Sequence, residues 1–146
     1  MPINIKYTAL FYLTFMILIL LTSSCKDNST GPSDKEFVLP DSNLSFDKDI
    51  GPLFLAKCAS GSGCHSSTSN PSGLDLTDYQ QIQLHWVDTD AGPVKLVEPG
   101  SGNTSFLYRI LLSGYLGRIQ MPKDGPYLNQ NNTNGVKVWI DEGALY

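Results

Sequence analysis

An apolar run at residues 7–21 limits the possible folds more than any other feature, because it takes many hydrophobic residues away from a folded core. The run follows a single cation, Lys6, and its length of about 15 residues is below the roughly 20 that a helix needs to cross a bilayer. A short apolar run behind a positive charge is typical of a secretory signal peptide. We therefore predict a signal peptide, with a permanent membrane anchor as the alternative.

Residues 21–25, LTSSC, resemble the lipobox of bacterial lipoproteins, in which a cysteine after small residues is lipidated and becomes the mature N-terminus. The resemblance implies a signal peptide at residues 1–24 and lipidation of Cys25, with an unmodified thiol as the alternative. Residues 26–28, KDN, resemble the surface-export tags of some Gram-negative lipoproteins. The implied location is extracytoplasmic, with the protein lipid-anchored to the outer membrane on its periplasmic side or at the cell surface.

Composition divides the rest of the chain into two parts. Residues 25–44 are rich in Ser, Asp, Asn, Gly and Pro and show no helical or strand period, which predicts a flexible tether. We predict that residues 45–146 form the only domain. At this size a polypeptide core is barely stable by itself. A buried prosthetic group would add apolar surface to such a core.

Four segments of the domain have helical patterns. The spacing of Ile50, Leu53 and Phe54 predicts a helix that begins near Asp47 and leads into Cys58. Three further helices are predicted at residues 77–84, 104–113 and 132–142, the last ending at a glycine, Gly143. No segment alternates strongly between apolar and polar residues, so we predict an all-α fold with long irregular loops.

The charge of the chain argues against a nucleic-acid partner. Without residues 1–24 the chain keeps all 14 acidic residues and loses one of its 10 basic residues, Lys6. Nucleic acids are bound through clustered Lys and Arg side chains, and the sequence has no such cluster.

The segment CASGSGCHS at residues 58–66 carries the main chemical signal. Cys58, Cys64 and His65 resemble the haem-attachment signature C-x-x-C-H, except that five residues separate the cysteines. Those five residues, ASGSG, are small and conformationally permissive. In an oxidising compartment two such thiols pair as a disulfide unless a haem or a metal ion binds them. A disulfide loop without a cofactor and a zinc site that adds His85 are the alternatives.

Met121 is the single methionine outside the predicted signal peptide, and it lies in a loop rich in Pro and Gly. A lone methionine is usually a packing residue. Following Cys58, Cys64 and His65, however, it is a candidate iron ligand, because histidine with methionine is the axial pair of electron-transfer cytochromes. For the second histidine, His85, a surface position is favoured over contact with a haem propionate or iron ligation.

Five segments, in order, resemble a cytochrome c domain of the planctomycete type: FDKDIGPLFLAKC leading into GCH, GLDLTDYQQI, VEPGSGNTSFLYRIL, MPKDGPYLN and VKVWIDEGAL. The resemblance implies a cytochrome-c-like helical fold with covalently bound haem c. It implies thioether attachment at Cys58 and Cys64, with His65 as the proximal and Met121 as the distal iron ligand.

This resemblance implies a monohaem electron carrier rather than an enzyme, because both axial positions of the iron are filled. Its redox partner proteins are unknown. The sequence shows no paired carboxylates, Ser-His arrangement or phosphate-binding loop above chance. Two alternatives are open: a haem-free module stapled by a disulfide, and the electron-entry subunit of a larger exported oxidoreductase.

Overall fold

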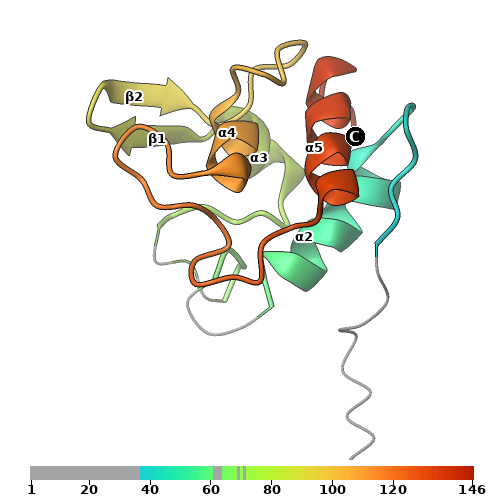
Figure 1. Cartoon of the computed structure of the whole chain (residues 1–146), viewed down its shortest axis with the longest axis horizontal. Coiled ribbons are helices and arrows are strands. Elements are labelled where there is room, and N and C mark those ends of the chain that lie inside the picture. The colour runs from blue at the N-terminus through green and yellow to red at the C-terminus, as the bar shows by residue number, and fades with distance from the viewer. Residues whose placement is uncertain (1–36, 61–63, 69, 71) are drawn as a thin grey trace, which may run out of the picture. The chain divides into compact units, whose positions relative to one another are not determined.

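The computed structural model describes residues 37–60, 64–68, 70 and 72–146. A one-turn π-helix, η1, is the first element of the described part and continues directly into the first α-helix (Figure 1). A short helix and a β-hairpin follow, and two helices complete the chain. The elements are η1 (Phe46–Ile50), α2 (Gly51–Lys57), α3 (Tyr79–Leu84), β1 (Trp86–Thr89), β2 (Gly92–Lys95), α4 (Phe106–Leu112) and α5 (Gln130–Asp141).

The prediction of an all-α fold is wrong, because β1 and β2 form an antiparallel two-stranded sheet. Thr89 pairs with Gly92, so only Asp90 and Ala91 form the turn. Gly92 has a positive φ of 102°, a conformation that favours glycine, and the Thr89 hydroxyl donates to the Gly92 carbonyl at 2.6 Å. Each strand has four residues, which is too short for a clear alternating pattern, and the second contains Pro93.

All four predicted helices are present, with shifted ends. The first begins earlier than predicted, because the Ser45 hydroxyl rather than Asp47 accepts from the backbone of the first turn. Asp78 caps α3 and Asn129 caps α5 in the same way. Gly143 follows the end of α5 with φ 103°, which confirms the predicted glycine stop.

The core is centred on Trp139 of α5, whose side chain is fully buried. Its indole ring meets Phe54 of α2 edge-on, with the ring centroids 6.4 Å apart, and lies 6.2 Å from the ring of Phe46. The indole N–H donates to the Leu145 carbonyl at 2.8 Å. The last helix therefore packs against the first helix of the domain through these aromatic side chains.

Residues 37–44 fall within the predicted tether, yet this stretch packs against α5. Leu39 and Leu44 are 5% and 3% exposed. The Leu39 amide donates to the side chain of Asn131, and the Leu44 amide donates to the carboxylate of Glu142. The packed part of the chain thus begins before residue 45.

The predicted signal peptide and lipidation site, residues 1–24 and Cys25, lie outside the described residues. Within the described ranges no helix has the length and hydropathy needed to span a membrane.

Candidate functional site

Cys58 occupies the C-terminal end of α2, where its amide donates to the Phe54 carbonyl at 2.8 Å. Its side chain is 9% exposed and belongs to the hydrophobic core. Cys64 is half-buried, and both cysteines are free thiols in the structure. Helix α2 thus places the first cysteine at the edge of the core.

The backbone brings His65 back to Cys58 across the intervening loop. The His65 amide donates to the Cys58 carbonyl at 3.0 Å, and the His65 carbonyl accepts from the Leu76 amide at 3.0 Å. These two bonds hold His65 between the end of α2 and the segment that precedes α3. The predicted trio of Cys58, Cys64 and His65 therefore forms one local cluster.

The imidazole of His65 is oriented through its Nδ1 atom, which lies 3.3 Å from the Leu74 carbonyl and 3.2 Å from the Ser72 hydroxyl. A carbonyl can only accept, so the contact with Leu74 favours the tautomer in which Nδ1 carries the proton and Nε2 keeps its lone pair. A backbone carbonyl on one ring nitrogen is the usual partner of a histidine that binds a metal through the other. The ring of His65 is thus prepared to act as a ligand through Nε2.

The turn that follows Leu74 is fixed by Asp75, which is 5% exposed. Its carboxylate accepts from the Thr77 amide at 2.8 Å and from the Thr77 hydroxyl at 2.6 Å. Side-chain bonds of this kind stabilise a turn locally. They therefore hold the segment that carries the Leu74 carbonyl.

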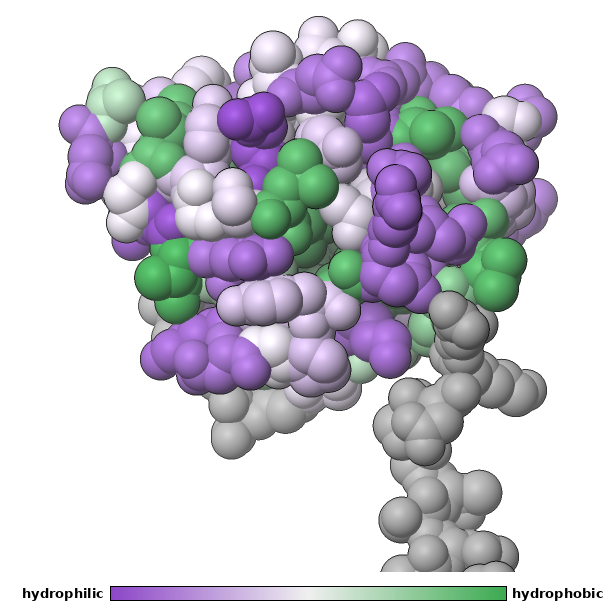
Figure 2. All heavy atoms as spheres, in the orientation of Figure 1, coloured by the Kyte–Doolittle hydropathy of each residue, from purple (hydrophilic) through white to green (hydrophobic). Residues whose placement is uncertain are grey.

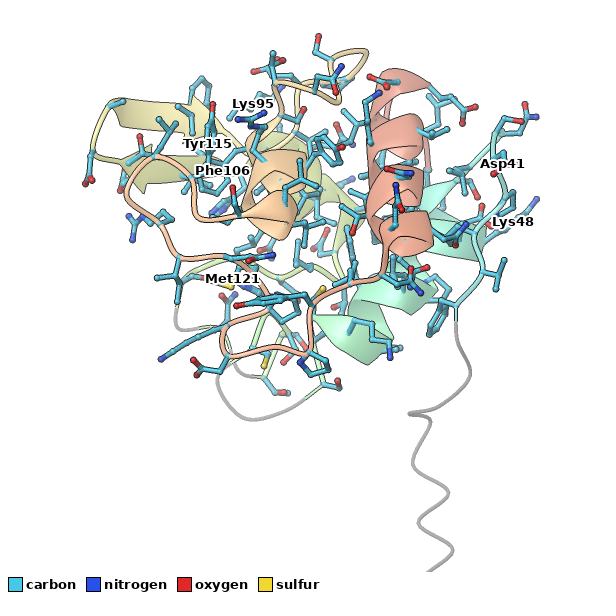
Figure 3. The ribbon with its side chains drawn as sticks, viewed as in Figure 1. Asp41, Lys48, Lys95, Phe106, Tyr115 and Met121 are labelled. Carbon is cyan, nitrogen blue, oxygen red and sulfur yellow. The ribbon has the colours of Figure 1, made fainter. Side chains whose placement is uncertain are left out.

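Met121 lies in the long loop between α4 and α5 (Figure 3). Its amide donates to the Ile110 carbonyl at 3.0 Å, and the side chain of the preceding residue, Gln120, donates to the Leu111 carbonyl at 3.0 Å. Two consecutive residues are thus tied to the last turn of α4. The partly buried Met121 side chain packs against the same core cluster that contains Cys58.

His85 is half-buried at the end of α3. Burial lowers its pKa, the nearby His65 imidazole lowers it further, and the carboxylate of Asp88 opposes both effects. The structure therefore brings the two histidines near each other, although their sequence positions gave no sign of it. Among the described residues no three His, Cys, Asp or Glu side chains are arranged to hold a metal ion, so the alternative zinc site is not assembled there.

The environment of Cys58 predicts low thiol reactivity in the folded, haem-free chain. Burial raises its pKa from 9.0 to about 12, and the nearby Cys64 adds to the rise. Below pH 9 the fraction of Cys58 that is present as thiolate should be on the order of 1000-fold lower in the folded chain than in the unfolded chain. We expect iodoacetamide to modify Cys64 at pH 8 and to leave Cys58 unmodified until denaturant is added, as read by peptide mass mapping.

Equal labelling of Cys58 in the native and unfolded chain would contradict the buried position of this thiol.

The raised pKa of Cys58 also predicts how the free energy of unfolding depends on pH. Because the folded state releases the Cys58 proton less readily, the stabilisation is complete below pH 9 and is lost as the pH rises from 9 toward 12.

The sequence identified Cys58, Cys64, His65 and Met121 by residue type, but not the groups that orient them. The partner of His65 is a backbone carbonyl, which any residue at position 74 would supply. The chain matches no family model, and no curated protein or solved structure is significantly similar to it.

Proposed function

We propose that the domain is a monohaem c-type cytochrome that transfers single electrons outside the cytoplasm, anchored to a membrane through lipid on Cys25. The observation that carries the proposal is the orientation of His65. Its Nδ1 atom faces the Leu74 carbonyl, a contact that favours a proton on Nδ1 and leaves Nε2 as a ligand next to the two free thiols of Cys58 and Cys64.

The donor set fits haem c better than it fits a zinc ion. Two thiols can each add S–H across one vinyl group of haem, which forms two thioethers and requires no oxidant. The imidazole that directly follows the second thiol is available for one face of the iron. The thioether of Met121 is a soft, neutral ligand suited to the other face. When bound, haem supplies an iron that gains and loses one electron.

Exposed apolar side chains that are close in sequence to the predicted ligands are compatible with a large apolar cofactor. Leu112 and Ile119, which precede Met121 in the chain, are 47% and 55% exposed. Leu55, three residues before Cys58, is 60% exposed. Figure 2 shows that hydrophobic side chains reach the surface in several separate places on the face it draws. Contact with a porphyrin would remove part of such apolar surface from water.

The chain's own residues would hold the cofactor rather than react with substrate. Attachment through Cys58 and Cys64 retains it in an open compartment. The Leu74 carbonyl orients the His65 ring, and Met121 is tied to α4 through its backbone. If His65 and Met121 both held the iron, no ligand site would be left for a substrate, which would favour electron transfer over the activation of a bound substrate.

The test is the full-length chain produced in a host with active cytochrome c maturation. We expect an intact mass increased by one haem and a sharp α band after reduction with dithionite. Cys64→Ala should lose the thioether at that position, and Cys58→Ala should lose the other. Cys25→Ser is the matched control, because it removes a cysteine outside the cluster and should leave the haem content unchanged. A colourless protein that lacks the two thiol hydrogens would instead identify a disulfide-stapled module and refute the proposal.

A further inference from the structure

A groove of about 280 Å³ lies on a part of the domain that contains none of the proposed haem ligands. Its walls come from the β-hairpin, the loop after it, α4 and the turn that follows α4. The residues that line it include Trp86, Lys95, Glu98, Phe106 and Tyr115. Figure 3 shows Lys95, Phe106 and Tyr115 close together between the hairpin and α4.

The aromatic side of the groove is held in place by several contacts. Phe106 is buried, and its ring centroid lies 5.8 Å from that of Tyr115. The guanidinium of Arg109 lies over the Tyr115 ring, 5.0 Å from its centroid. The side chain of Arg118 donates to the Asp88 carbonyl at 2.9 Å, which ties the turn after α4 to the hairpin. These contacts fix the position of the Phe106 and Tyr115 rings and of the turn that carries Tyr115.

Trp86 provides a second aromatic surface on the hairpin. It pairs directly with Lys95 across the two strands, so both side chains lie on the same face of the sheet. The Trp86 side chain is 60% exposed. An exposed tryptophan beside a lysine offers a stacking surface and a positive charge to the same ligand.

In the described part of the chain the two charged groups of the groove, on Lys95 and Glu98, have no partner that would compete with a ligand. Among the described residues neither the Lys95 ammonium nor the Glu98 carboxylate forms a hydrogen bond or an ion pair. Lys95 can bind a carboxylate or phosphate, and Glu98 can accept a hydrogen bond from an N–H or O–H group. The positive charge of Arg109, above Tyr115, adds to the attraction for an anion.

We propose that this groove binds a small planar aromatic anion that also donates a hydrogen bond. Tyr115 and Trp86 contact its ring, Lys95 pairs with its carboxylate or phosphate, and Glu98 accepts its N–H or O–H. The volume lies just below the range for drug-sized ligands, which suits one ring or two fused rings. The proposal goes beyond electron transfer and does not depend on whether the chain carries haem.

The experiment titrates the full-length protein, purified in detergent, with three matched probes followed by saturation-transfer and chemical-shift NMR. Indole-3-acetate has the ring, the charge and the donor. Indole-3-ethanol lacks the charge, and 1-methylindole-3-acetate lacks the N–H. We expect indole-3-acetate to bind with a dissociation constant of roughly 1 mM, as for other ligands of its size. The two other probes should bind about two- to fivefold more weakly.

Substitutions in the groove test which side chain accounts for each difference in affinity between the probes. Lys95→Met should reduce the affinity for indole-3-acetate to that for indole-3-ethanol, whereas Lys48→Met should have no effect. Lys48 is an exposed lysine on η1 and lies beyond α5 in Figure 3. Glu98→Gln should reduce the preference for the N–H probe, and Trp86→Ala should weaken all three probes. These three groove residues are partly or fully exposed, so the variants should fold.

Two results would overturn the proposal. One is the absence of saturable binding at about ten times the expected dissociation constant. The other is binding of all three probes with equal affinity that Lys95→Met and Lys48→Met leave equally unchanged, which would indicate non-specific adsorption. Both are read from the NMR titration alone, so they are distinct from the absence of a haem band.

Discussion

Replacing Trp139 with alanine is expected to lower the free energy of unfolding by about 3–5 kcal/mol, because the indole is fully buried and contacts two other aromatic rings. The substitution removes a large apolar side chain and leaves a cavity. It also removes the N–H donor to the Leu145 carbonyl. A loss of this size is a large fraction of the total stability of a small domain. Denaturant unfolding of wild-type and variant protein with the same haem content measures it.

Trp86→Ala is the matched control, since it removes the same side chain from a position that is 60% exposed. Its effect on the free energy of unfolding should stay below about 1 kcal/mol. Trp139→Phe should fall between the two, because it keeps an aromatic ring and loses the hydrogen bond to Leu145. Equal destabilisation by Trp139→Ala and Trp86→Ala would show that the core does not depend on the last helix.

Helix α5 shows why some elements of the fold could be predicted from the sequence. Val136, Trp139 and Ile140 lie three and four residues apart, and all three side chains are fully buried. A glycine with a positive φ follows the helix, as predicted. Both signals are local, so they can be read without knowledge of distant contacts.

The hairpin at Trp86–Lys95 could not be predicted from local signals of this kind. Its strands are stabilised by pairing with each other and by Arg118, which lies thirty residues from Asp88 in the sequence, rather than by any internal period.

The candidate site could likewise be predicted only in part from the sequence. The thiols, the imidazole and the thioether are visible as residue types, whereas the proximity of His85 to His65 and the Leu74 carbonyl at His65 depend on the fold.

Replacing Met121 with leucine is expected to lower the reduction potential of the haem-loaded protein while leaving its haem content unchanged. Leucine has nearly the volume of methionine, so the contact with the core is retained and only the sulfur is lost. A methionine ligand opposite histidine raises the potential, and its loss should lower it. The loss should also open one axial position, so the reduced variant should bind carbon monoxide where the wild type does not.

Potentiometric titration and the carbon monoxide spectrum of the reduced protein provide the two measurements. Leu128→Ala is the control, because Leu128 is a partly buried residue of the same loop that packs against the same core but has no sulfur. It should reduce stability and leave the potential near that of the wild type. If Met121→Leu and the wild type share one potential and neither binds carbon monoxide, Met121 is a packing residue. His85, which lies near His65, would then be the next candidate for the distal ligand.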